Sequence, residues 1–117
     1  MNAEQIALVR KSWGMVAPIA DQAADIFYNR LFEIDPTTKS LFKGDMKEQG
    51  GKLMTMVGVA VDGLDNLDFI VPAVQDLGRR HGRYGVVESH YGTFASALLY
   101  TLRQGLGAEF TPDVKEA

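Results

Sequence analysis

Apolar residues recur along most of the chain at spacings of three and four, which is the period of an amphipathic α-helix. The first stripe comprises Ile6, Val9, Trp13 and Val16. Further stripes are Ile19, Ala23, Ile26, Phe27 and Leu31; Leu53, Met56, Val57, Ala60 and Leu64; Ile70, Val74 and Leu77; and Tyr91, Phe94, Leu98 and Leu102. No segment shows the sustained alternation that is typical of strands. The pattern therefore predicts an all-α protein.

Residues that begin and end helices divide these stripes. The start signals are Asn2 with Gln5, Asp35 before Pro36, Asp45 with Glu48, and Thr111 before Pro112. Pro18 and Pro72 are each expected in the first turn of a helix. We expect one helix to reach about Leu64, one to end at His81 with Gly82 as its stop, and one to run from about Val87 to Leu102. Gly105 and Gly107 should end that helix.

Composition narrows the class of protein. A chain of 117 residues predicts one domain, residues 1–117. The net charge of −3 gives no reason to expect nucleic acid or an anionic membrane as a partner. No apolar run is long enough to cross a bilayer, and the N-terminus does not resemble a signal peptide. The lack of cysteine fits a reducing compartment, so we expect a cytoplasmic protein.

His81 lies on the same helical face as Ile70, Val74 and Leu77. A histidine at the end of an apolar stripe is either a core residue satisfied by a carbonyl or a metal or haem ligand. A zinc site with several ligands is disfavoured, because the chain has one other histidine and no cysteine. A haem iron requires only one histidine from the protein. Spacing alone leaves both interpretations open.

Two other polar residues interrupt apolar faces. Gln49 lies one turn before Leu53 on its stripe, where it either reaches solvent or enters a pocket. Tyr28 lies at the edge of its stripe, where its hydroxyl either reaches water or points inward. Gly50 and Gly51 each weaken a helix, which a closely crossing second helix would explain.

Several motifs resemble the globins, in particular the flavohaemoglobin-type single-domain bacterial haemoglobins. The proximal-histidine region of that family resembles Leu77-Gly78-Arg79-Arg80-His81, followed by Tyr84-Gly85-Val86 and His90-Tyr91. A second match is Phe27-Tyr28-x-x-Leu31-Phe32, followed by Pro36 and Leu41-Phe42. The motifs occur in the family's order and span nearly the whole chain. The resemblance implies a globin-like helical sandwich around one haem.

The resemblance also implies a set of site residues. His81 would bind the iron of haem b, and Tyr28 and Gln49 would face the bound ligand from the distal side. Leu53 would form the apolar wall beside Gln49, and Phe42 would stack on the haem. Tyr91 would lie against His81, and Arg80 would pair with a haem propionate. His90, which is off the apolar stripe, is expected at the surface.

Two distal hydrogen-bond donors favour tight binding of O2 and other diatomic gases. Oxidation of nitric oxide by O2 is then an expected activity, and it requires a separate reductase. The alternatives are a gas-sensor domain from a longer signalling protein and a haem-free helical interaction module.

The chain departs from the family at its end, because little more than one helical turn follows Pro112. The final globin helix is therefore expected to be largely missing, together with any carboxylate that it would contribute to the His81–Tyr91 network. Trp13, Phe94 and Leu98 would then be uncovered, which predicts a homodimer.

Overall fold

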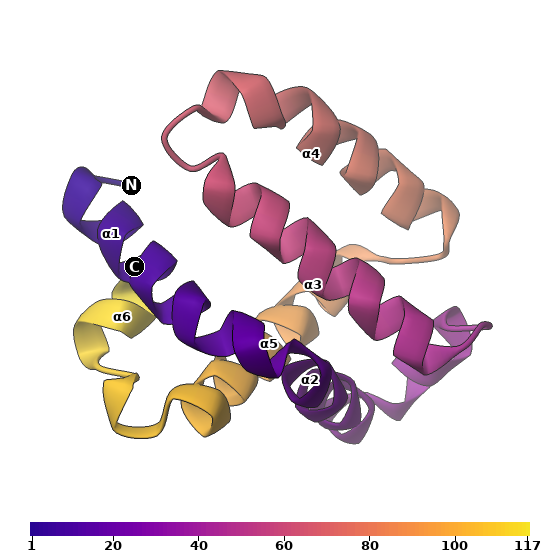
Figure 1. The fold of residues 1–117 in the computed structure, drawn as a ribbon. Coiled ribbons are helices and arrows are strands. Elements are labelled where there is room, and N and C mark those ends of the chain that lie inside the picture. The colour runs from indigo at the N-terminus through magenta and orange to yellow at the C-terminus, as the bar shows by residue number, and fades with distance from the viewer.

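The computed structural model describes all 117 residues and contains six α-helices, three short 3-10 segments and no strand (Figure 1). The helices are α1 (Ala3–Val16), α2 (Ala20–Ile34), α3 (Met46–Asp62), α4 (Leu67–Arg83), α5 (Glu88–Leu106) and α6 (Pro112–Glu116). The 3-10 segments are η1 (Ala17–Ile19), η2 (Pro36–Leu41) and η3 (Gly107–Glu109). The prediction of an all-α fold is confirmed. None of the helices is both long and apolar enough to cross a membrane.

The predicted helix starts are confirmed. The Asn2 side chain accepts a hydrogen bond from the Gln5 backbone N–H, and the Gln5 side chain accepts one from the Asn2 backbone N–H, which completes the capping box of α1. Asp35, Asp45 and Thr111 each accept a backbone N–H at the start of η2, α3 and α6. The Asp45 side chain accepts its hydrogen bond from the Lys47 backbone N–H, and not from that of Glu48 as expected.

Four boundary predictions were wrong. Helix α5 continues past Leu102 and through Gly105 to Leu106, so only Gly107 lies at its end. Pro18 lies in η1 rather than in the first turn of α2. Pro72 lies inside α4, past its first turn, because the helix begins already at Leu67. Gly82 does not end α4, which continues to Arg83. The chain turns at Gly85, whose φ of 95° favours glycine, and Gly82 remains an ordinary helical residue.

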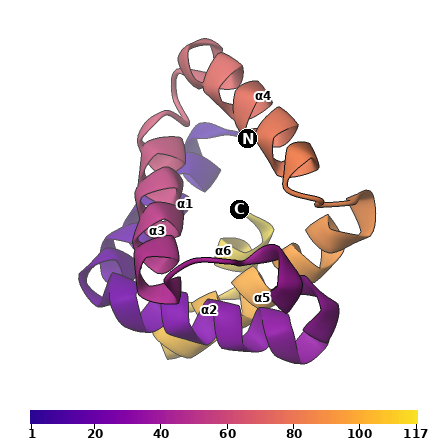
Figure 2. The ribbon, with the colours of Figure 1, turned by 90° about the vertical axis from the view of Figure 1, so that its right-hand side faces the viewer.

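Helix α2 forms the centre of the packing and contacts α5, α3 and η2 (Figure 2). One core cluster contains Phe27, Tyr28, Leu31 and Ala97 and therefore joins α2 to α5. A second cluster contains Val16, Ala23 and Leu106 and joins the end of α1 to the same two helices. The α2–α5 pair thus carries both parts of the apolar core.

The face formed by Trp13, Phe94 and Leu98, which was predicted to be uncovered, is partly covered. Trp13 packs against the second cluster, as does Val114 of α6, which contacts α1. Leu98 packs against the first cluster, and the Phe94 ring meets the Phe27 ring at 5.0 Å between centroids. The prediction of three uncovered residues was therefore too strong for Trp13 and Leu98, which are partly buried, whereas Phe94 remains 37% exposed.

The glycine pair in α3 is explained at one position. A Cβ on Gly50 would lie 2.9 Å from the Cβ of Ala24, so α3 crosses α2 at close range there. Gly51 is exposed, and no atom would lie within 4 Å of its Cβ. The predicted close crossing is confirmed for Gly50 and wrong for Gly51, which points away from α2.

Candidate functional site

An aromatic cluster surrounds Tyr28 on the inner side of α2. Tyr28 is 6% exposed and packs edge-on against Phe42 of the following segment, with 5.2 Å between ring centroids. Phe42 also meets Phe32 at 5.5 Å. The edge-to-face geometry is the favoured one for aromatic rings. Tyr28 and Phe42, assigned to one pocket from sequence, are therefore direct neighbours.

Gln49 approaches the same tyrosine from α3. Burial raises the pKa of Tyr28, and the nearby Gln49 side chain offsets part of that rise. The phenol consequently stays neutral at physiological pH and keeps a proton to donate. Leu53, one turn after Gln49, packs against the cluster that contains Tyr28. The three residues predicted for the distal side, Tyr28, Gln49 and Leu53, thus lie in one region between α2 and α3, next to Phe42, which was predicted to stack on the haem.

His81 lies near the end of α4 and is partly buried. Its Nδ1 lies 2.7 Å from the carbonyl oxygen of Leu77, one turn earlier. A carbonyl oxygen can only accept, so Nδ1 carries the proton and Nε2 has an available lone pair. A neutral imidazole oriented in this way is suited to bind a metal ion through Nε2.

Helix α4 is set apart from the rest of the fold in both views (Figures 1 and 2). It has no buried residue and makes no extended contact with another helix. Its apolar stripe is only partly covered, because Val74 is 50% exposed whereas Ile70 and Leu77 are partly buried. A partly uncovered apolar face that ends in a histidine with a free lone pair fits a flat, apolar, iron-containing group such as haem.

The remaining predicted residues lie at the edges of this region. Arg80 is paired with Asp76 on its own helix, with 3.1 Å between Nε and Oδ2, so its guanidinium is not fully available to a propionate. Tyr91 is 52% exposed at the start of α5 and does not belong to a core cluster. The ring that contacts His81 is that of Tyr84, at 5.8 Å between centroids.

Sequence reasoning assigned no role to Tyr84. Tyr84 lies three residues after His81, a spacing that places two side chains on one helix face. That signal was hidden by the wrong prediction that Gly82 ends the helix. His90, expected at the surface, accepts the Val87 backbone N–H with Nδ1 and so caps α5.

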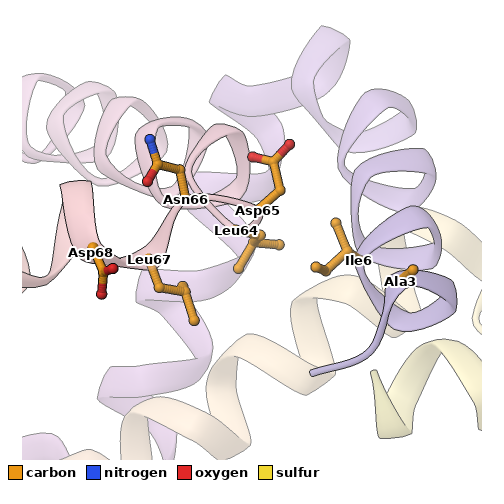
Figure 3. Close-up of a pocket in the computed structure, with 7 residues that line it drawn as sticks. All are labelled: Ala3, Ile6, Leu64, Asp65, Asn66, Leu67 and Asp68. Atoms are coloured by element: carbon orange, nitrogen blue, oxygen red, sulfur yellow. The ribbon is translucent and has the colours of Figure 1, made fainter.

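A shallow depression of about 450 Å³ lies elsewhere, between the start of α1 and the corner that joins α3 to α4 (Figure 3). Its lining includes Ile6 from α1 and Leu64, Asp65 and Leu67 from the corner. None of the predicted site residues lines it, so it is separate from the region around Tyr28 and His81.

A sequence model of the globin family matches residues 25–117, which include Tyr28, Gln49, His81 and Tyr91. The chain therefore belongs to the globin family. Globins bind haem and, through it, diatomic gases.

Individual relatives lie in two groups. The chain is 28% identical over 120 aligned positions to a flavohemoprotein of Rhodopirellula baltica, and the alignment covers the whole chain but 29% of that protein. It is 29% identical over 131 positions to the neuroglobin of Danio rerio, again over its whole length and 82% of the relative. A neuroglobin of Tetraodon nigroviridis is 27% identical. The chain thus spans less than a third of the flavohemoprotein and most of the neuroglobins.

Proposed function

We propose that this globin binds haem b and that Nε2 of His81 would be the protein ligand of the iron. The observation that carries the proposal is the 2.7 Å pairing of Nδ1 with the Leu77 carbonyl, which fixes the tautomer and the ring direction. The exposed part of the apolar stripe of α4 supplies apolar surface for the haem, and the exposed ring of Tyr91 supplies aromatic surface. Bound haem supplies an iron centre that accepts O2, nitric oxide or carbon monoxide.

Tyr28 and Gln49 are the proposed distal donors. The Tyr28 phenol is neutral and keeps its proton, and the Gln49 side-chain amide carries two N–H groups, so each residue could donate a hydrogen bond to a ligand of partial negative charge. A hydrogen bond in such a pocket is worth about 1–3 kcal/mol, or roughly one to two decades in the rate of ligand release. This retention favours ligand holding over oxygen transport. Leu53 and Phe42 would exclude water from the same space.

Oxidation of nitric oxide is the proposed reaction for a ligand held in this way. Nitric oxide, O2 and one electron combine to give one nitrate ion. The electron must come from outside these 117 residues, and a separate reductase is the proposed source. The likeness to a flavohemoprotein supports this proposal. A reducing cytoplasm, consistent with the lack of cysteine, is the proposed compartment.

The open surface supports a proposal of self-association. A compact monomer of this mass is expected to expose about 6,300 Å², whereas the chain exposes 7761 Å². A stable dimer buries about 800 Å² on each partner. Part of the excess can therefore be covered by haem and part by a second copy. A monomer in light scattering at micromolar concentration, with haem retained, would contradict this proposal.

The absorption spectrum of the purified protein tests haem binding directly. His81→Ala should lose stable haem binding, because α4 offers no other ligand on that face. His90→Ala is the matched control, since His90 is the only other histidine and serves as a helix cap. Full haem content and an unchanged spectrum in His81→Ala would rule out His81 as the ligand.

A further inference from the structure

Helix α4 is attached to the fold mainly through its two ends. It carries His81, yet none of its residues is buried and no other helix packs along it. The direction of the helix must therefore be set by the corners that precede and follow it. The corner after α4 is held by backbone hydrogen bonds around Gly85. The corner before it, residues 63–66, has an additional side-chain attachment.

That attachment is Arg10 of α1. Its guanidinium donates to the Asp62 carbonyl at 3.1 Å and, through Nε, to the Val61 carbonyl at 3.4 Å. It also pairs with the Asp65 carboxylate, with 3.0 Å between Nη2 and Oδ1 and 3.5 Å between Nη1 and Oδ2. One planar side chain thus holds the last turn of α3 and the corner together, in a fork geometry that lysine cannot reproduce.

The corner is also closely packed on its other side. A Cβ on Gly63 would overlap the side chain of Ile70, so α4 folds back tightly on the end of α3. Figure 3 shows Leu64, Asp65 and Asn66 at this corner, opposite Ile6 on α1. Arg10 and Gly63 therefore restrain the corner from two directions.

We propose that Arg10 and Asp65 are positioning residues for His81, because they fix the direction in which α4 leaves the corner. The inference rests on the proposed role of His81 as the haem ligand. Fourteen residues separate Leu67 from His81, which corresponds to about 21 Å along a helix. A tilt of roughly 5° at the corner then moves the imidazole by about 2 Å, the length of a metal–nitrogen bond. An attachment at one end of α4 thus controls the geometry at the other.

Arg10→Met and Asp65→Asn test the proposal, with Glu33→Gln as the matched control. Glu33 also pairs with an arginine at 3.0 Å and is similarly exposed, but its partner Arg30 lies on the same helix. The test uses the haem-loaded protein. The measurements are amide hydrogen exchange by helix, the rate of haem transfer to excess apomyoglobin, and the iron–histidine stretching band of the reduced protein.

Arg10→Met and Asp65→Asn should each speed hydrogen exchange in residues 67–83 by about three- to fivefold. The rate of haem transfer should rise by the same factor, which is the effect expected from losing a partly exposed ion pair. The stretching band should shift, and α2 and α5 should exchange at the wild-type rate. The double variant should be no worse than Arg10→Met alone, since Arg10→Met already removes the pairing with Asp65. Glu33→Gln should leave all three measurements unchanged.

Wild-type exchange in α4 and wild-type haem transfer in both variants would overturn the proposal. Equal acceleration in all helices would also overturn it, because that result indicates general destabilisation rather than positioning. A protein that carries no haem would refute the proposed function instead, and exchange in α4 would still decide whether Arg10 holds the corner.

Discussion

Gly50 and Gly51 are neighbours on α3 for which the structure predicts opposite effects of the same substitution. In Gly50→Ala the new methyl carbon would lie 2.9 Å from the Ala24 Cβ, about 0.6–1.1 Å closer than the favoured carbon–carbon separation. Neither carbon can rotate away, so α2 and α3 must move apart. Overpacking of this kind lowers the free energy of unfolding by about 1–3 kcal/mol. The higher helix propensity of alanine raises it by about 1 kcal/mol.

Gly51→Ala meets no atom within 4 Å on an exposed helix face. It should therefore stabilise the protein by about 0.5–1 kcal/mol. The free energies of unfolding of the two variants should differ by about 1–3 kcal/mol, with Gly50→Ala the less stable.

Urea unfolding followed by circular dichroism at 222 nm measures this difference, and both variants have the same composition and helix length. Gly50→Ala should also weaken the contact between Tyr28 and Gln49, because it separates the helices that carry them. The Tyr28 pKa, followed by ultraviolet absorption, should change in Gly50→Ala and not in Gly51→Ala. Equal stability of the two variants would show that α2 and α3 do not cross as closely as described.

Other predictions concern the distal pair and the titrating groups. Tyr28→Phe and Gln49→Leu should each speed O2 release by about tenfold or more, with coupling in the double variant; stopped-flow rates within twofold of wild type for both would contradict the assignment. Because burial raises the pKa of Tyr28, its contribution to stability is complete below pH 10 and is lost as the pH rises through the raised value. Tyr28→Phe should remove that alkaline loss in unfolding titrations. The hydrogen bond from the Thr37 side chain lowers the pKa of Asp35, so its contribution is present above the usual carboxyl pKa and is lost as the pH falls towards the lowered one. Asp35→Asn should flatten the fall in stability as the pH drops below about 4, and an unchanged profile would contradict this reasoning.

The sequence predicts those parts of the fold that depend on neighbouring residues. The helix starts at Asn2, Asp35, Asp45 and Thr111 were correct, because a cap and its backbone partner lie within three residues. The end of α4 was not, because Gly82 and Gly85 are equally plausible stops until the backbone conformation is known. Only Gly85 adopts a positive φ.

Contacts between segments that are distant in the sequence were harder to predict. Arg10 reaches residues more than fifty positions away, and no local pattern distinguishes it from an ordinary surface arginine. Tyr28 and Gln49 were assigned to one pocket through resemblance rather than periodicity, and they do meet. Their roles, and those of His81 and Tyr91, stay predictions until the haem-loaded protein is measured.

The α2–α5 pair that carries the core has a consequence for how the chain folds. More than fifty residues separate the end of α2 from the start of α5, so their contact closes a long loop that contains α3 and α4. Closing such a loop costs roughly 2 kcal/mol more in chain entropy than forming a local turn of about four residues. The contact between Phe27 and Ala97 offsets that entropy loss. Substitutions that weaken this contact should therefore slow folding. Changes in α4 should alter the unfolding rate instead, because a helix without packed neighbours has little structure to contribute to the transition state.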